Sequence, residues 1–292
     1  MRYKCALGFF MVYFSLCGSV FAQDQDNVTN RIKAQDILKR ARLAASNEYR
    51  ADEIKTIRVT QEFSTQLTAS VSGRPDVENK SKIKSQLDFD LSGFKVKESL
   101  EKDTVSTFRG ISQSNKTLEE RVLNGNRVSY SSDMINGGPK QMKFDLPNTS
   151  SEEKANIVFR TRIFPTLFPI TYDLSILPFD FYYVGIAESE NKRANVIEAA
   201  MKDGQTLKLF FDQDNDLLLL ITFMSATDEG TVKEDKYFYS EYKDINGLLV
   251  ATKIKRNQLL KNKAITEKNV ELREVKELQI NPTFKVDNFK EN

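Results

Sequence analysis

Apolar residues follow two different periods along the chain, and each period predicts a different kind of element. Over residues 29–50 they recur every three or four positions, and Thr29 or Asn30 can serve as the N-cap. Over residues 57–71 they alternate with polar residues, which is typical of a long strand with one face in the core. The sequence therefore predicts one amphipathic helix followed by strands.

Turn signals separate the alternating runs that follow. Alternation resumes over residues 83–91 and slips at Ser92-Gly93, as at a bulge or a tight turn. Asn-Gly or Asp-Gly pairs, which supply the positive φ angles of tight hairpin turns, follow at 124–125, 203–204 and 246–247. We therefore predict a mainly β fold with few helices: a strongly curved or half-closed antiparallel sheet, with the N-terminal helix against its concave face.

Two apolar segments do not fit this alternation. Residues 217–224, LLLLITFM, would point apolar side chains to both faces of a strand, so each face needs an apolar cover. Residues 159–184 are also strongly apolar, yet Pro165, Pro169 and Pro178 forbid a long regular helix there. Both segments must therefore pack against something apolar.

The N-terminus has the pattern of a secretory signal peptide. Two basic residues precede an apolar stretch of signal-core length, which ends in Val-Phe-Ala at Ala22 before a polar run. We predict that residues 1–22 are a signal peptide, cleaved after Ala22. A lipoprotein signal using Cys17 is an alternative, but bulky Leu16 stands where a small residue is wanted. An uncleaved anchor helix is a further alternative, for which the apolar stretch is short.

Composition then indicates a compartment. Cleavage would remove both cysteines, Cys5 and Cys17, and the chain has no His and no Trp, so the mature protein could form no disulfide. An exported chain of this size without cysteine is typical of a Gram-negative periplasm, which we predict as its location. Removing Arg2 and Lys4 from the 43 basic residues leaves 41, against 41 acidic residues. This balance predicts no nucleic-acid partner.

Most catalytic chemistries lack their residues in this chain. Without His and mature Cys, the commonest general base and the thiolate nucleophiles are missing. We also find no Gly-rich phosphate loop and no nucleophile elbow, while a Ser/Lys or paired-carboxylate enzyme stays open. We predict a protein that is not an enzyme and that uses no cofactor.

An acidic turn resembles a calcium loop only in part. Asp212, Asp214 and Asp216 match the first three ligands of an EF-hand loop. Leu217 then stands where Gly is needed, and Phe223 where a bidentate Glu is needed. We predict a charged hairpin tip and no metal site.

The second half of the chain resembles a known family. The resemblance rests on the segments NVIEAAMKDGQTLKLFFDQDNDLLLLITFM, YFYSEYKDINGLLVATKIK and INPTF, followed by Phe289. The first half is similar in order: a helix, a long strand, a second strand near SGFKVKES, and a hairpin at VLNGNRVSY. Over residues 31–289 the chain resembles the outer-membrane lipoprotein-sorting superfamily of LolA and LolB.

This resemblance implies a half-barrel with helices plugging an apolar cavity that holds acyl chains. It implies a single domain over residues 23–292, from which this chain departs by a polar and apolar insert at about residues 131–170 that looks specific to it. Within the insert, IFPTLFPI at residues 163–170 is predicted to form a lid over the cavity.

We accordingly predict a periplasmic carrier that buries a lipid, a lipoprotein acyl chain or another apolar ligand. An envelope membrane protein is a further candidate partner. The alternative is a protein-interaction or scaffold module with a filled core and no small ligand. The candidate ligand contacts in the cavity and lid are Phe164, Leu167, Phe168, Ile170, Phe181, Tyr183, Phe211, Leu218 and Leu220.

Overall fold

The computed structural model describes most of the sheet and the two helices that pack on it. The described residues are 14–46, 53–71, 76–93, 95–124, 127–134, 163–174, 180–189, 191–200, 205–226, 230–262, 264–285 and 287–290. Side chains are described throughout these ranges except at 14–26, 127–134 and 200. Statements below about what is present or absent refer to these residues.

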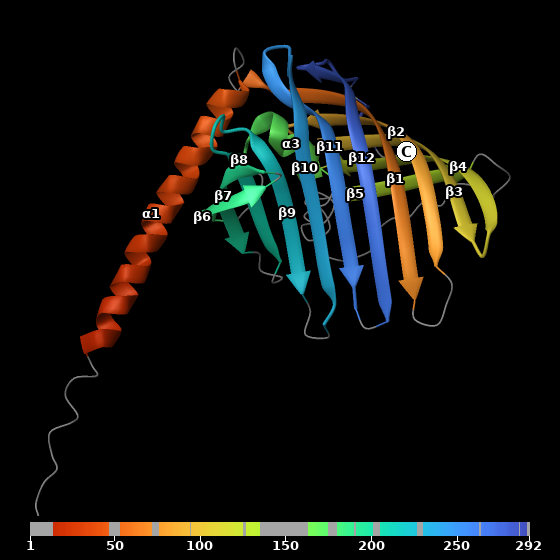
Figure 1. Cartoon of the computed structure of the whole chain (residues 1–292). Helices are drawn as coiled ribbons and strands as arrows, with labels where there is room; N and C mark the ends of the chain where they lie inside the picture. Colours follow the sequence, from red (N-terminus) through yellow and green to blue (C-terminus); the bar gives the residue numbers. More distant parts are fainter. Residues whose placement is uncertain are drawn as a thin grey trace, which may run out of the picture.

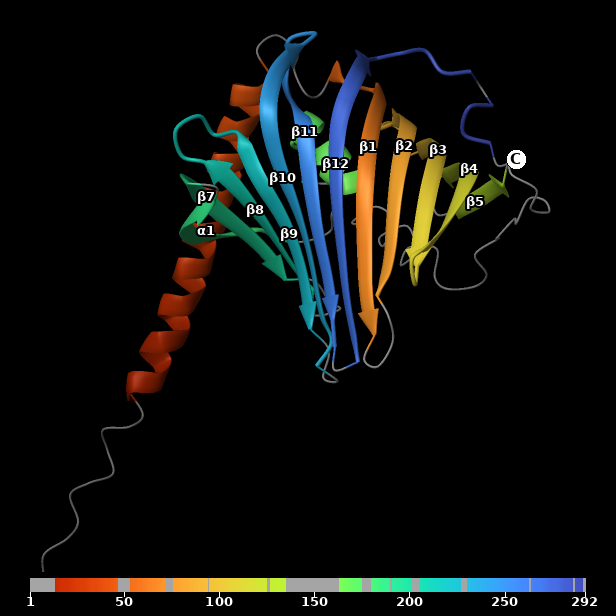
Figure 2. The same cartoon turned by 45° about the vertical axis from the view of Figure 1, so that its right-hand side comes forward.

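A single antiparallel sheet forms the body of the protein. Its order is β5-β4-β3-β2-β1-β12-β11-β10-β9-β8-β7-β6, so the first and last long strands meet in the middle. The sheet curves around its inner face and stays open between β5 and β6 (Figures 1 and 2). The predicted mainly β, curved antiparallel fold is confirmed. The strands are β1 Thr56–Val71, β2 Val77–Asp90, β3 Lys95–Phe108, β4 Ile111–Asn124, β5 Arg127–Met134, β6 Tyr182–Ser189, β7 Lys192–Ala200, β8 Thr206–Asp212, β9 Leu218–Ala226, β10 Val232–Ile245, β11 Leu248–Lys261 and β12 Ile265–Ile280.

The turn signals produce hairpins where the structure describes them. Asn246 and Gly247 both have positive φ, 54° and 79°, between β10 and β11, as a tight hairpin turn requires. The slip at Ser92-Gly93 is a tight turn, in which the Gly93 amide donates a hydrogen bond to the Asp90 carboxylate at 3.0 Å. The other two predicted turns, at 124–125 and 203–204, lie wholly or partly outside the described residues.

The N-terminal helix α1, Phe14–Ala45, packs on the sheet only with its second half. Ala34, Ile37 and Ala41 are buried where the helix meets β6 and β11. The N-terminal part of α1 runs away from the sheet (Figure 1). Ile32, expected on the same apolar face, is 61% exposed although its neighbours Arg31 and Lys33 contact Tyr182 and Tyr183 of β6, so Ile32 lies on the side of α1 that faces away from the sheet. Among the described helices, none has the length and apolar character of a membrane span. Ala22 lies within α1, and cleavage after it stays a prediction.

The second helix, α3, Phe164–Thr171, lies on the inner face behind β10, β11 and β12 (Figure 2). All eight of its residues are buried, and it packs against β11. Pro165 stands in its first turn and Pro169 inside it, so the helix stays short, as the prolines predict. The predicted insert therefore begins within β5 and ends within α3, while residues 135–162 lie outside the described residues.

Strand β9 shows what covers its two apolar faces. Ile221 and Phe223 join the core on the inner face, where the Phe223 ring meets Tyr237 edge-on at 6.2 Å. On the outer face, Leu220 pairs across the sheet with Phe210 on β8 and Phe238 on β10. The core thus covers one face, and neighbouring aromatic residues flank the other.

Candidate functional site

The inner face has two parts of different chemistry, and they share the long strands β11 and β12. One part is apolar and is covered by α3. The other is a cavity of about 200 Å³ toward β1, β2, β3 and β4, lined by charged, polar and apolar side chains. We call these the α3 part and the charged cavity.

Aromatic contacts dominate the α3 part. The Phe164 ring stacks on Phe168 at 4.9 Å and meets Phe223 of β9 edge-on at 6.4 Å. At the C-terminal end of α3, Tyr172 contacts Phe168 at 5.6 Å and Phe211 of β8 at 6.4 Å. Contacts of this kind add to the free energy gained by burying apolar surface.

The structure gathers most of the sequence-predicted ligand contacts in this part. Tyr183 packs at its border under the Lys33 ammonium, 3.7 Å from the ring centroid, and Leu220 lies on the outer face of β9. The residues that share the buried core are Phe164, Leu167, Phe168, Ile170, Phe181, Phe211 and Leu218. In this structure they pack against one another, and their contact with a ligand stays a prediction.

Two side chains of the sheet hold α3 by hydrogen bonds. The Tyr239 hydroxyl donates to the Pro165 carbonyl at 2.6 Å, and Arg273 Nη1 donates to Thr166 Oγ1 at 3.1 Å. Burial raises the pKa of Tyr239 well above its ordinary value, so this hydroxyl keeps its proton. The helix is therefore fixed by polar contacts at its first turn and by apolar contacts along its length.

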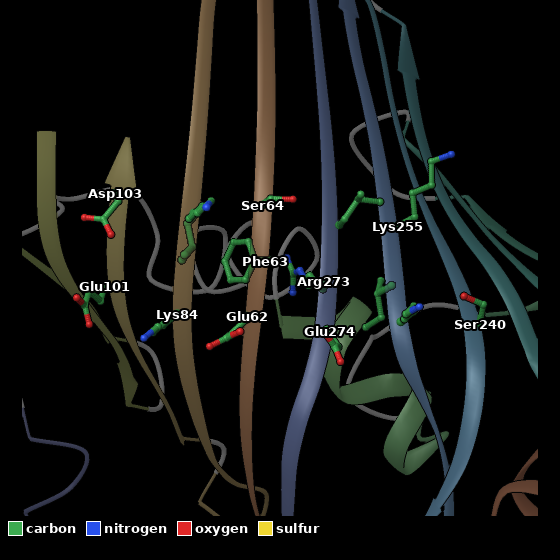
Figure 3. A pocket seen from close by; sticks show the side chains of 15 residues that line it. Glu62, Phe63, Ser64, Lys84, Glu101, Asp103, Ser240, Lys255, Arg273 and Glu274 are labelled. Atoms are coloured by element: carbon green, nitrogen blue, oxygen red, sulfur yellow. The ribbon is translucent and has the colours of Figure 1, made fainter. Parts of the chain in front are cut away.

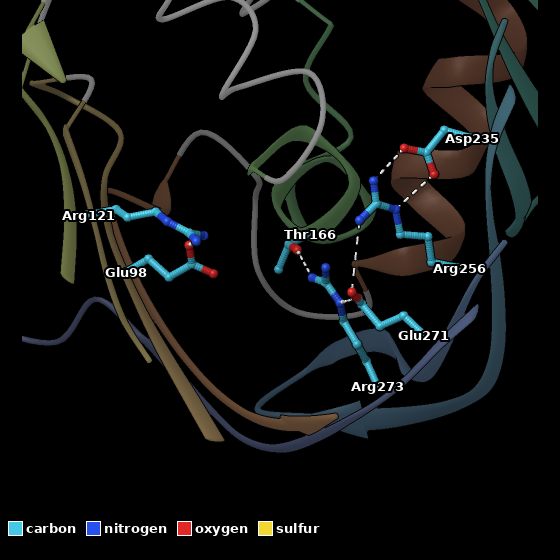
Figure 4. Close-up of polar contacts among 7 residues, drawn as sticks. All are labelled: Glu98, Arg121, Thr166, Asp235, Arg256, Glu271 and Arg273. Atoms are coloured by element: carbon cyan, nitrogen blue, oxygen red, sulfur yellow. Dashed lines mark hydrogen bonds and ion pairs between the residues drawn. The ribbon is translucent and has the colours of Figure 1, made fainter. Parts of the chain in front are cut away.

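A network of buried charges joins the α3 part to the charged cavity (Figure 4). Arg256 forms a bidentate pair with Asp235, at 2.8 and 2.6 Å, and Arg273 pairs with Glu271. A longer contact of 3.9 Å joins Arg256 to Glu271. All four side chains are at least nine-tenths buried. Burial alone would lower the pKa of Arg256, but its hydrogen bonds to Asp235 raise that pKa above the ordinary value, so the guanidinium stays charged.

The opposite wall of the charged cavity carries a second group of charges. Arg121 on β4 pairs with Glu98 at 2.8 Å and with Glu119 at 2.7 Å. Lys102 on β3 also lines the cavity. Figure 4 shows Glu98 and Arg121 on one side of the curved sheet and the network around Arg256 and Arg273 on the other. Charged side chains therefore face a common space from both sides.

Apolar and amide groups complete the lining of the charged cavity. Phe63, Leu67, Ile83 and Leu100 supply apolar surface between the charges. The side-chain oxygens of Asn79 and Asn269 are buried and have no hydrogen-bond partner among the described residues. This combination can bind a ligand that has both a polar group and an apolar part. Within the described part of the chain, no three metal-ligating side chains come together.

A larger hollow, of about 690 Å³, lies on the outer face of the sheet (Figure 3). Leu272, 54% exposed, supplies apolar surface there. Basic and acidic side chains alternate across it, so the hollow selects no single sign of charge. These charged residues are Lys82, Lys84, Lys253, Lys255, Glu62, Glu101, Asp103, Glu274 and Arg273, of which Arg273 also lines the charged cavity.

Sequence reasoning missed the charged residues of the inner face, although the alternation contains a signal for them. Arg273 and Glu271 share a strand face with Val275, and Arg256 shares one with Ile254. Charged residues at core-facing positions of a strand break the apolar pattern, and this break could have marked the cavity.

Comparison with known proteins gives distant structural likenesses. No protein-family model and no curated protein matches the sequence. Similar solved structures include a LolA superfamily protein from Nitrosomonas europaea, with 9% identity, 88% of this chain and 97% of that chain covered, and a TM-score of 0.38. A DUF1329 family protein from Desulfovibrio piger has 14% identity, coverages of 89% and 97%, and a TM-score of 0.41. A chain of the MucA/MucB complex of Pseudomonas aeruginosa has 11% identity, coverages of 86% and 100%, and a TM-score of 0.20.

The first of these structures carries the superfamily name that the sequence resembles. TM-scores of 0.20 to 0.41 carry no argument about function. Conclusions about function therefore rest on the geometry of this chain.

Proposed function

We propose that the protein is a periplasmic carrier for a ligand with a long apolar segment, held on the inner face of the half-barrel beside α3. The observation that carries this proposal is α3 itself, a short helix whose eight residues are all buried on the concave face of an open sheet. A helix of this kind shields an apolar surface from water until a ligand covers it.

Burial of the ligand supplies the affinity in this proposal. Each methylene removed from water contributes about 0.8 kcal/mol, so about ten methylenes supply on the order of 8 kcal/mol. Part of that free energy is spent in moving α3 off the sheet. A lipid or the acyl chain of a lipoprotein has this chemistry.

The helix α3 acts as the lid. Its fixed points on the sheet are the hydrogen bonds to Pro165 and Thr166, both in the first turn. When the lid moves outward, the apolar side chains of Phe164, Leu167 and Phe168 stay available to contact the ligand chain. The prolines prevent α3 from growing into a longer helix that could no longer close.

A protein-interaction module with a filled core is the second candidate. It is favoured by the close packing of Phe164, Phe168 and Phe211 in the closed arrangement. Its partner would be an envelope membrane protein. Native mass spectrometry of protein purified without detergent separates the two candidates: co-purified lipid supports the carrier, and a lipid-free mass with a stably bound partner supports the module.

The lid is tested by chemical labelling. Leu167, 2% exposed, is replaced by Cys in a chain carrying Cys5→Ser and Cys17→Ser, and its reaction with a maleimide is followed with and without a fluorescent fatty acid. We expect saturable binding of the fatty acid and faster labelling in its presence. Leu209→Cys, at a fully buried position of β8, is the matched control and should stay unreactive. The carrier proposal fails if no binding is seen at micromolar concentration.

A further inference from the structure

Arg273 touches both parts of the inner face. Its Nη1 donates to Thr166 of α3, and the same side chain lines the charged cavity. A ligand chain that lies beside α3 therefore has one end next to this cavity. The chemistry of the cavity then decides what kind of head group the ligand carries.

The carboxylates of the cavity are already engaged by arginines. Glu98 and Glu119 are held by Arg121, and Glu271 is held by Arg273. Asp235, behind the cavity wall, takes a bidentate pair from Arg256. A cationic head group would have to compete with these guanidinium groups for each carboxylate.

Several cationic donors, in contrast, have capacity left. Lys102 has no ion-pair partner among the described residues. Nη2 of Arg273 and Nη1 of Arg256 form no hydrogen bond with any described residue, although Nη1 of Arg256 lies 3.9 Å from Glu271. Nη1 of Arg273 would also be released if α3 moved and took Thr166 with it.

Lys102 and Arg273 stand at the two ends of one row of paired residues across the sheet. Lys102 of β3 pairs with Ile83 of β2, Ile83 with Phe63 of β1, and Phe63 with Arg273 of β12. Three strand spacings of about 4.8 Å separate the ends of the row. On a concave face, long side chains at both ends converge above the apolar pair Phe63 and Ile83.

We propose that the charged cavity binds the anionic head, a carboxylate or a phosphate, of an amphiphile whose chain lies beside α3. This inference rests on the carrier function proposed above. Lys102 and Arg273 contact the head from two sides, and a hydrogen bond from Arg273 to an anionic oxygen replaces its weaker bond to the neutral Thr166 hydroxyl. Binding of the head group therefore loosens α3, and this movement makes room for the apolar chain of the ligand.

The experiment compares matched ligands on the full-length protein by calorimetry. Dodecyl phosphate and dodecanoate carry the anionic head, dodecanol has the same chain without charge, and inorganic phosphate is the head without a chain. All are used below their micelle concentrations. We expect dodecyl phosphate and dodecanoate to bind at least about tenfold more tightly than dodecanol, and inorganic phosphate to bind far more weakly than either.

Lys102→Met tests the cavity without breaking an ion pair. We expect it to weaken binding of both anionic amphiphiles by about tenfold and to leave dodecanol unchanged. Lys82→Met, on the outer face of β2, is the matched control and should change neither. Arg273→Lys keeps the positive charge but loses the planar set of guanidinium donors, so it should weaken binding of the same two anionic ligands.

The outcomes separate this inference from the carrier proposal. Equal affinity for dodecanol and dodecyl phosphate, unaffected by Lys102→Met, overturns the anionic head and leaves the carrier standing. No binding of any dodecyl compound overturns both. Inorganic phosphate binding as tightly as dodecyl phosphate would show a site for a free anion and would also overturn the amphiphile.

Discussion

The α3 part and the charged cavity lie on the same sheet face but are held together by different forces. In the α3 part, Phe164, Phe168 and Phe223 form a buried aromatic cluster. In the charged cavity, Glu271 and Arg273 of β12 form a buried pair of opposite charges. Strands of 14 to 16 residues are long enough for one end to face a core and the other a polar space. The length of the strands therefore allows one half-barrel to contain both an apolar core and a charged cavity.

The two parts also differ in how much they stabilise the fold. Burying aromatic side chains stabilises the fold directly. Burying the pairs Asp235 with Arg256 and Glu271 with Arg273 carries a desolvation cost that their attraction roughly offsets. Well-packed apolar residues of similar volume in place of a buried ion pair often leave stability unchanged or raise it. The gain in stability from these charges is therefore smaller than that from the aromatic cluster, and the proposed binding of an anionic head gives the charged cavity a second role.

The largest expected effect tests whether α3 is a lid or a fixed piece of core. Replacing Phe164 and Phe168 together by Ser should lower the free energy of unfolding by about 4 kcal/mol, since the loss cannot exceed the docking free energy of α3. Two Phe sites in a rigid core would lose roughly 6 to 10 kcal/mol. Urea unfolding measures the loss, and fluorescent fatty-acid uptake should weaken in parallel.

Phe89→Ser is the control for that experiment. Phe89 is fully buried on β2, whereas α3 packs against β11, and Phe89→Ser should show the ordinary loss of about 3 to 5 kcal/mol without a specific effect on uptake. An additive loss in the α3 double variant, together with no saturable uptake by the unmutated protein, would favour the filled-core module.

The second prediction concerns the charged cavity. Glu271→Gln should lower the free energy of unfolding by about 3 kcal/mol, because Arg273 is left buried without its anion. The double variant Glu271→Gln and Arg273→Gln should lose clearly less than Glu271→Gln alone. A double-mutant cycle in urea measures the coupling between the two side chains. Additive losses would mean that the two charges do not stabilise each other.

The fold could be predicted from sequence because each local signal agrees with it. Alternation over residues 57–71 and the Asn246-Gly247 turn gave strands and hairpins that the structure contains. The pairing of β1 with β12 could not be read in this way, because no turn joins segments that lie so far apart in the chain. Long-range pairing depends on the closure of the whole sheet.

The site was predicted only in its apolar part. Prolines and aromatic residues marked residues 163–170 as an unusual buried segment, which the structure places as α3. The position of α3 over β11, and the approach of Arg121 and Arg273 from opposite walls, depend on the curvature of the sheet. Alternation tells which residues share a strand face, but not which strands face each other across a cavity.

The third prediction uses pH to compare the two parts. Burial raises the pKa of Tyr172, at the end of α3, to about 12. The unfolded chain ionises this hydroxyl near its ordinary pKa of about 10, so the stabilisation is fully present below pH 10 and is lost between about pH 10 and 12. At pH 11 the loss should be about 1 kcal/mol. Tyr172→Phe should make the alkaline decline less steep, and an unchanged decline would contradict the burial of this hydroxyl.

The smallest effect is expected where α1 meets the hairpin tip between β8 and β9, at the border of the α3 part. Arg40 Nε donates to Asp216 at 3.1 Å, but the Arg40 side chain is 42% exposed, so Asp216→Asn should cost only about 0.5 kcal/mol. Asn tolerates the positive φ of 58° at this position, so no backbone strain is added. Asp214→Asn, at an exposed position of the same turn, is the control and should have less effect still.

Millimolar calcium should leave the Tm of the unmutated protein unchanged, because Lys192 holds the Asp212 carboxylate at 2.7 Å and Arg40 holds that of Asp216. A calcium-dependent rise in Tm that both substitutions abolish would instead assign this turn a metal.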